Sequence, residues 1–242
     1  MLDQATHWIE IAGTVLDGLL LCRILMLRLH RIYLFITLAC LLALFFDLVA
    51  LWLGTSSAEG QRVFLYNRFL YAILFPLAAW DSFEEVKTQI AKLRRLAAAR
   101  LVSGLFFAAI FGLIMSAFFE TKDANGGSAL VTTLGLILWA GSSTASLAFL
   151  WTLHRQIRAQ NIARPNNTFV WMTYYELSLI GEVLSCLSLL VLASAAAYVS
   201  SQTADTLNIA FNSYGILVTA WCILKLRAVA SDFPSAPENA SL

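Results

Sequence analysis

Long apolar runs separated by short polar segments dominate this chain. A membrane-spanning helix needs about 20 mostly apolar residues, and seven segments meet that requirement: 8–28, 31–54, 63–86, 97–119, 129–152, 170–198 and 206–226. The pattern therefore predicts an all-α fold, a polytopic transmembrane bundle of seven spans within residues 1–228. Residues 229–242 contain two prolines among small polar residues and are expected to form a disordered cytoplasmic tail.

Two segments have a more specific pattern. In residues 82–100, apolar residues recur at helical spacing between charges, so the helix at 63–86 is expected to continue into the cytoplasm as an amphipathic extension. The span at 97–119 has small residues at four-residue spacing, which lets membrane helices approach closely. This helix-packing ridge consists of Gly104, Ala108, Gly112 and Ser116. Its partner is either another helix of this chain or a second copy.

Composition and charge support an integral membrane protein and orient it. Hydrophobic residues make up 60% of the chain and charged residues 13%, against about 45–50% and 25% in soluble domains. If the even-numbered connections are placed outside, all Lys and Arg residues except Arg62, Arg68 and Lys122 lie on the opposite side. The positive-inside rule then predicts an outer N-terminus and a cytoplasmic C-terminus, in a bacterial cytoplasmic membrane.

Ionisable and amide side chains inside the predicted spans fall into three layers. An ionisable group at the centre of a span costs about 2.5–3.5 kcal/mol on insertion scales, so each needs a partner or a function. The outer polar layer contains Asp47, Arg68, Asn208 and Asn212, the centre contains Asp17 and Glu182, and the inner polar layer contains Arg23, Asp81 and Glu176. We expect structural ion pairs, Asp47 with Arg68 and Arg23 with Asp81 or Glu176.

Asp17 and Glu182 are different, because no basic residue is expected at their depth. Helical spacing places Glu182 on the face that also has Ser178, Gly181 and Ser185. Each carboxyl is then either a protonated structural group, bonded to a serine such as Ser185 or Ser143, or a proton-carrying or cation-binding site. The sequence leaves both alternatives open. Glu176 is expected to be an interfacial anchor.

No cofactor, metal site or catalytic residue is predicted. Retinal would need a lysine inside the last span, and Lys225 lies at its cytoplasmic end. Haem would need histidines on facing helices, and His7, His30 and His154 all lie near helix ends. Zinc-protease, nucleophile-elbow and phosphate-loop motifs are absent from the sequence. The basic inner face is expected to contact anionic lipid rather than nucleic acid.

Two stretches carry a resemblance to other proteins. The segment "LRLHRIYLFITLACLLALFFDLVALWLG", followed by "YAILFPLAAWDSFEEV", is similar to a group of uncharacterised bacterial seven-helix membrane proteins. The matching residues are Arg31, Tyr33, Phe35, Asp81, Phe83 and Glu84. The resemblance covers roughly the first half of the chain, and it implies a topology but no activity.

Two functions fit this sequence best, and an intramembrane enzyme or haem protein is the third and least favoured class. The first is a non-catalytic membrane subunit or receptor-like protein that binds another membrane protein or a second copy of itself. The alternative is a small proton- or cation-coupled transporter with central carboxylates. The stretch "YAILFPLAAW" in the third span is similar to "YGILVTAW" in the seventh. For the transporter, this similarity suggests a parallel repeat of three helices, with one linking helix between the two copies.

Overall fold

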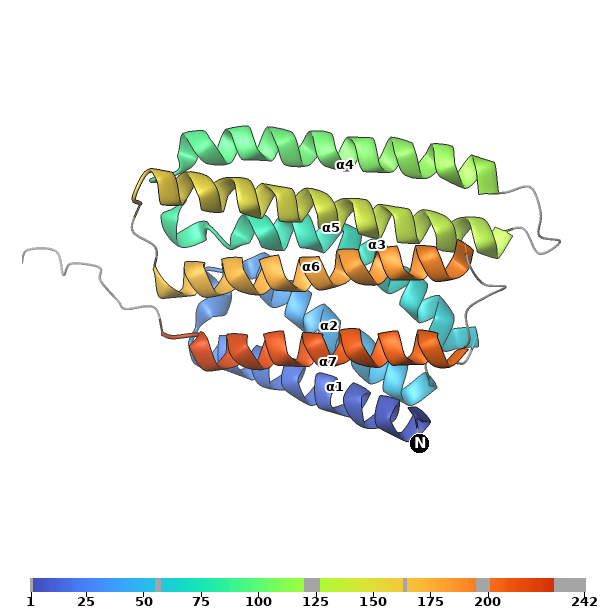
Figure 1. Ribbon diagram of the computed structural model, residues 1–242. Coiled ribbons are helices and arrows are strands. Elements are labelled where there is room, and N and C mark those ends of the chain that lie inside the picture. The colour runs from blue at the N-terminus through green and yellow to red at the C-terminus, as the bar shows by residue number, and fades with distance from the viewer. Residues whose placement is uncertain (1, 55–57, 120–126, 163–164, 195–200, 229–242) are drawn as a thin grey trace, which may run out of the picture.

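The computed structural model describes residues 2–54, 58–119, 127–162, 165–194 and 201–228, which form helices and no strands (Figure 1). The expected tail at 229–242 lies outside these residues. Two short 3₁₀ helices, η1 (Leu29–Arg31) and η2 (Glu84–Val86), join some of the α-helices. The α-helices are α1 (Leu2–Met26), α2 (Leu34–Leu53), α3 (Ala58–Asp81), α4 (Ala91–Phe119), α5 (Gly127–Ala159), α6 (Asn166–Ser194) and α7 (Ser201–Lys225).

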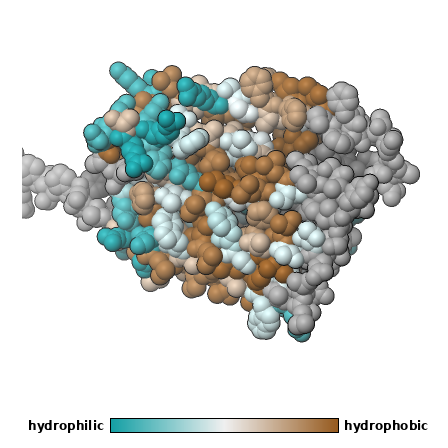
Figure 2. All heavy atoms as spheres, in the orientation of Figure 1, coloured by the Kyte–Doolittle hydropathy of each residue, from teal (hydrophilic) through white to brown (hydrophobic). Residues whose placement is uncertain are grey.

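The expected all-α fold is confirmed, and each apolar segment corresponds to one helix. Within the described residues, three helical stretches are long and apolar enough to cross a membrane: Leu34–Leu53, Ala91–Ile114 and Leu134–Ala159. Hydrophilic residues gather at the end where α4 and α6 begin, while apolar residues dominate the middle of the visible face (Figure 2). These features indicate a membrane protein.

Six α-helices form a closed ring, and the remaining one, α4, lies outside it. Extensive contacts join α1 to α2, α2 to α3, α3 to α5, α5 to α6, α6 to α7, and α7 back to α1. By contrast, the extensive contacts of α4 among the described residues are with α5 alone. Figure 1 shows α4 along one side of the bundle, next to α5. The ring therefore has an interior that α4 does not reach.

The amphipathic segment at 82–100 does not extend the third helix as expected. α3 ends at Asp81, the chain turns through η2, and α4 begins at Ala91. The apolar residues of the segment fold back into the core, where Phe83, Val86 and Ile90 are fully buried. A straight extension of α3 would leave these apolar side chains in water, whereas the turn buries them, and this burial favours the turn. The segment therefore connects α3 to α4 instead of projecting from the bundle.

The small-residue ridge of α4 packs against α5 of the same chain. A Cβ atom added to Gly104 would lie 3.1 Å from the Cβ of Ala145, and one added to Gly112 would lie 3.2 Å from Ile137. A Cβ on Gly141 of α5 would collide with Ala108. These contacts answer the question that the sequence left open, except at Ser116, whose side chain lies outside the described residues.

Pro76 inside α3 is accommodated by a side chain of α5. A proline has no N–H, so it leaves the carbonyl four residues earlier without its helical hydrogen bond. Here that carbonyl belongs to Ala72, and the hydroxyl of Ser142 donates to it at 2.5 Å. Neighbouring hydroxyls often satisfy such freed carbonyls in membrane helices. This bond joins α3 and α5 and contributes to closing the ring.

Candidate functional site

Two carboxyl groups from different helices face each other inside the ring. Asp17 lies on α1 and Asp47 on α2, and their side chains lie within hydrogen-bonding range of each other. Two carboxyl groups can form such a bond only when one of them holds a proton, because a carboxylate is an acceptor without a hydrogen. The geometry therefore allows the two carboxyl groups to share one proton.

Aromatic and thiol side chains from α2 and from three further helices lie around this pair. The electrostatic neighbours of Asp17 include Tyr71 of α3, Tyr174 of α6 and Cys40 of α2. Cys222 of α7 is in turn an electrostatic neighbour of Tyr174 and is fully buried. Since these residues come from α1, α2, α3, α6 and α7, the carboxyl pair must face the interior of the ring. We call these six residues the central cluster.

A second group of polar residues lies nearer α5. Arg68 of α3 is an electrostatic neighbour of Glu182 on α6, and its guanidinium lies 5.4 Å from the centre of the Trp139 ring. The structure thus links Arg68 to Glu182 and Asp47 to Asp17, in place of the expected link between Asp47 and Arg68. The expectation that no basic residue lies at the depth of Glu182 is therefore wrong.

Of the two serines that were expected to bond to Glu182, Ser143 does not do so. The Ser143 hydroxyl is fully buried on α5 and has no hydrogen-bond partner in the structure. Glu182 instead lies near Cys186 on its own helix as well as near Arg68. The structure therefore places Arg68, and not the Ser143 hydroxyl, within electrostatic range of this carboxyl group.

The inner polar layer is real, but its members bind partners other than the expected ones. Arg23 donates to the carbonyl of Leu226 at 3.1 Å and so joins α1 to the end of α7. Asp81 accepts the backbone N–H of Ile36 at 3.1 Å, in the first turn of α2. Glu176 contacts His154 at 3.0 Å. The expected pairing of Arg23 with an acidic residue is thus not seen.

The outer polar layer is described only in part. The side chain of Asn208 lies outside the described residues, and Asn212 is exposed on α7. At the opposite end of α7, Asn167 holds the last turn: its amide donates to the carbonyl of Arg227 at 2.9 Å and accepts the Arg227 N–H at 3.0 Å. Sequence reasoning did not identify this clamp.

Several residues of the two sites were not found by sequence reasoning. Tyr71, Tyr174, Cys40 and Cys222 are apolar or weakly polar by composition, so they do not stand out in an apolar span. The one available signal for Tyr71 was its place at the start of the repeated "YAILFPLAAW" motif. His154 was assigned only to an interfacial position, whereas the structure pairs it with Glu176.

The turn between α3 and α4 contains a charged cluster outside the helices of the ring. Glu84 accepts hydrogen bonds from Arg94 at 2.7 Å and from Lys87 at 2.6 Å. Partial burial alone would raise the pKa of Glu84, but these two hydrogen bonds lower it below its usual value. Arg94 also stacks 4.0 Å above the Trp80 ring. The cluster fixes the turn and gives no sign of binding a ligand.

The central cluster is the strongest candidate for a functional site. Within the part of the chain that the structure describes, no three His, Cys, Asp or Glu side chains are placed to hold a metal ion. The chemistry available at Asp17 and Asp47 is the binding and release of a proton or another small cation. Comparisons with known protein families, with curated proteins and with solved structures found no match. The resemblance to bacterial seven-helix proteins therefore stays a prediction.

Proposed function

We propose that this protein is a small membrane transporter coupled to protons or another cation, and that Asp17 and Asp47 hold the coupling ion. The observation that supports this most directly is the facing carboxyl pair inside the ring. Ionisable residues in membrane helices typically mark ion pathways and proton relays.

The aromatic residues around the pair suit a site that changes its charge. Tyr71 and Tyr174 lie within electrostatic range of Asp17, and each has a hydroxyl group. A hydroxyl can donate to a carboxylate and can accept from a carboxylic acid, so it satisfies both protonation states. Loss of the shared proton adds a negative charge to the pair, which changes its attraction for a cation and for a polar substrate. This dependence is the basis of the proposed coupling.

The order of the helices also supports transport. Around the ring the order is α1, α2, α3, α5, α6, α7. This cyclic order is unchanged when the first three helices are exchanged with the last three, as a parallel repeat with a linking α4 requires. In transporters of this type the substrate lies at the interface of the two repeats, near the middle of the bilayer. We further propose that all seven α-helices cross the membrane and that the N-terminus is outside.

The test is proton flux in vesicles. The purified protein is reconstituted into liposomes that contain a pH-sensitive dye, a pH gradient is imposed, and panels of sugars, amino acids and small cations are added. We expect one class of solute to accelerate the collapse of the gradient above that in empty vesicles. Asp17→Asn and Asp47→Asn are expected to reduce this acceleration to the level of empty vesicles, because an amide cannot exchange the shared proton.

A matched control separates coupling from a general loss of charge. Glu59→Gln removes an exposed carboxyl at the start of α3, outside the ring interior, and should transport like the unaltered protein. Asp17→Glu keeps an ionisable group and should retain part of the flux. If the unaltered protein shows no solute-dependent flux, or if both Asn variants transport normally, the transporter proposal is wrong.

The membrane-subunit function is the second candidate. The ridge of α4 is occupied by α5, so a partner would bind the opposite face of α4, where large apolar side chains are exposed. This face includes Val102, Phe106, Phe107, Ile110, Leu113 and Ile114. Native mass spectrometry of the gently extracted protein tests this candidate. A mass that includes a second polypeptide in fixed ratio would favour it over transport.

A further inference from the structure

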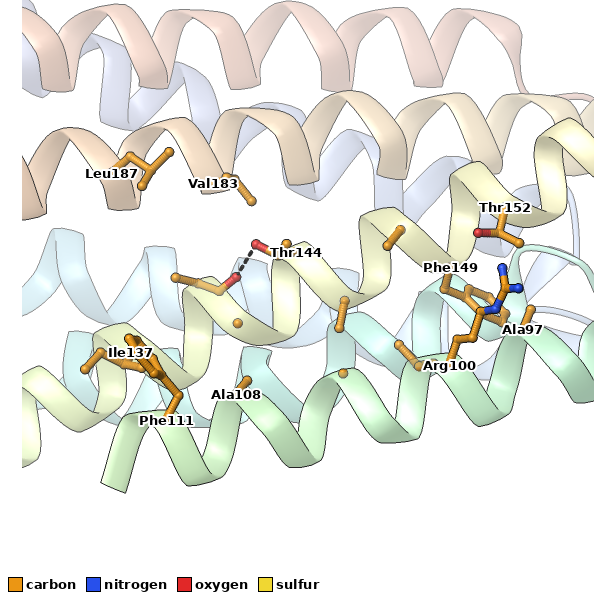
Figure 3. A pocket seen from close by; sticks show the side chains of 16 residues that line it. Ala97, Arg100, Ala108, Phe111, Ile137, Thr144, Phe149, Thr152, Val183 and Leu187 are labelled. Atoms are coloured by element: carbon orange, nitrogen blue, oxygen red, sulfur yellow. Dashed lines mark hydrogen bonds between the residues drawn. The ribbon is translucent and has the colours of Figure 1, made fainter. Parts of the chain in front are cut away.

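A groove with a volume of about 500 Å³ lies between α4, α5 and α6 (Figure 3). Its volume is within the range of roughly 300–1,000 Å³ that ligand pockets usually have. α4 and α5 pack closely against each other and form two walls of the groove. Val183 and Leu187 of α6 form the third wall. Since α4 lies outside the ring, the groove is on the outer side of the bundle and is separate from the central cluster.

The middle of the groove is apolar. Its lining includes only three polar side chains: Arg100, Thr144 and Thr152. The Thr144 hydroxyl donates to the carbonyl of Ala140 at 2.8 Å, so its hydrogen is already used within α5. Apart from these residues, small and apolar side chains line the groove. A polar ligand in its middle would therefore lose hydrogen bonds to water without replacement, whereas a hydrocarbon chain would lose none.

One end of the groove is basic. Arg100 lies one helical turn before Gly104 on α4, and it lines the groove together with Phe149 of α5. Figure 3 shows Arg100 at the end of the groove where α4 begins. The side chain is exposed, and no carboxylate pairs with it among the described residues. Arg100 therefore leaves a positive charge at this end.

We propose that this groove binds one acyl chain of an anionic phospholipid and that Arg100 binds its headgroup phosphate. α4 and α5 provide two of the three stretches that are apolar enough to cross a membrane, so the groove between them faces lipid. A phospholipid has the matching chemistry at both ends, with a hydrocarbon chain for the apolar wall and a phosphate for the guanidinium. This site is independent of the proposed transport function.

The experiment measures lipid retained by the full chain. The protein is purified in detergent, mixed with equal amounts of phosphatidylglycerol and phosphatidylcholine, and examined by native mass spectrometry and thermal unfolding. We expect one phosphatidylglycerol to be retained preferentially and to raise the unfolding temperature. Arg100→Gln should weaken its binding about fivefold, the factor expected for one basic residue near an anionic lipid. Ala148→Phe should also reduce retention, because it fills the groove from an exposed position.

The control is Arg95→Gln, which removes an exposed basic residue of the same helix that does not line the groove. This variant should retain phosphatidylglycerol like the unaltered protein. Equal losses in Arg95→Gln and Arg100→Gln would show a general attraction to the basic surface and would overturn the proposal. Equal retention of both lipids by the unaltered protein, or an equal thermal shift with inorganic phosphate alone, would also overturn it.

Discussion

Glu84 illustrates how a single residue stabilises a turn by binding two cations at once. Its two carboxylate oxygens accept from Arg94 and Lys87, and Arg94 in turn donates to the carbonyl of Trp80 at 3.2 Å. Arg94 is buried, whereas Lys87 is exposed. Because exposed ion pairs contribute little, the bond to Arg94 accounts for most of the stabilisation. The pair connects η2 to the start of α4.

We predict that Glu84→Gln lowers the free energy of unfolding by about 1 kcal/mol at pH 7. The hydrogen bonds depress the pKa of Glu84, so its contribution is fully present above the unfolded value near 4.5 and is lost as the pH falls through the lower folded value. The difference between the two proteins should therefore shrink below about pH 4. Thermal unfolding in detergent at pH 7 and pH 3.5 checks this, and an equal difference at both would contradict it.

A second prediction concerns Asp81, which caps a helix far from it in the sequence. The start of α2 has no capping side chain of its own, and Asp81 of α3 accepts the N–H of Ile36 instead. Asp81→Ala leaves this buried N–H unsatisfied and should cost about 1–3 kcal/mol of stability. Asp81→Asn keeps a carbonyl acceptor and should cost less.

The matched control for this prediction is Ser82→Ala at the neighbouring buried position. The Ser82 hydroxyl bonds only to the carbonyl of Ala78 within its own helical turn, so its loss should change stability little. Thermal unfolding of the three variants in the same detergent compares them. If Asp81→Ala is no less stable than Ser82→Ala, the cap does not contribute as proposed.

At the scale of helices, close backbone approach decides where α4 packs. Gly104, Ala108 and Gly112 meet Ala145, Gly141 and Ile137 in antiparallel order. Membrane helices have no hydrophobic driving force between them in lipid, so close packing of small residues supplies the attraction. α3 and α5 associate differently, through the hydroxyl of Ser142 and the carbonyl that Pro76 leaves free. α5 is thus the element on which both α3 and α4 assemble.

We predict that Gly141→Ala destabilises the packing of α4. The added methyl would collide with Ala108, and such overpacking typically costs 1–3 kcal/mol. Gly215→Ala on α7 is the control, because nothing lies within 4 Å of its added Cβ atom. It should be neutral or slightly stabilising, since alanine favours helix over glycine. Equal unfolding temperatures for the two variants would show that α4 and α5 are not in close contact.

At the scale of the whole molecule, the ring separates an interior with carboxyl groups from the groove between α4, α5 and α6 on the outer surface. α1 and α7 close the ring although they lie at opposite ends of the chain. Arg23 and Asn167 then hold the last turn of α7 by bonding to the carbonyls of Leu226 and Arg227. The proposed transport and the proposed lipid binding should therefore respond to different substitutions.

The proposed orientation predicts which positions react from each side of the membrane. In a variant with Cys22→Ser, which removes the exposed native thiol, we expect Glu59→Cys to react with a membrane-impermeant maleimide in intact cells. Thr88→Cys, in the exposed turn after α3, should react only after the cells are opened. The opposite pattern would reverse the orientation. Labelling of both positions from the same side would show that α3 does not cross the membrane.

The sequence by itself determined the all-α class and the seven helices, because apolar length and turn residues are properties of each segment alone. It also identified the carboxyl groups inside the spans, since a charge in an apolar run is visible without a structure. Only the tertiary structure decided their partners: Asp47 faces Asp17, Glu182 faces Arg68, and α4 packs on α5. These choices depend on the rotation of each helix about its axis and on which helices become neighbours, and both are settled by packing between segments far apart in the chain.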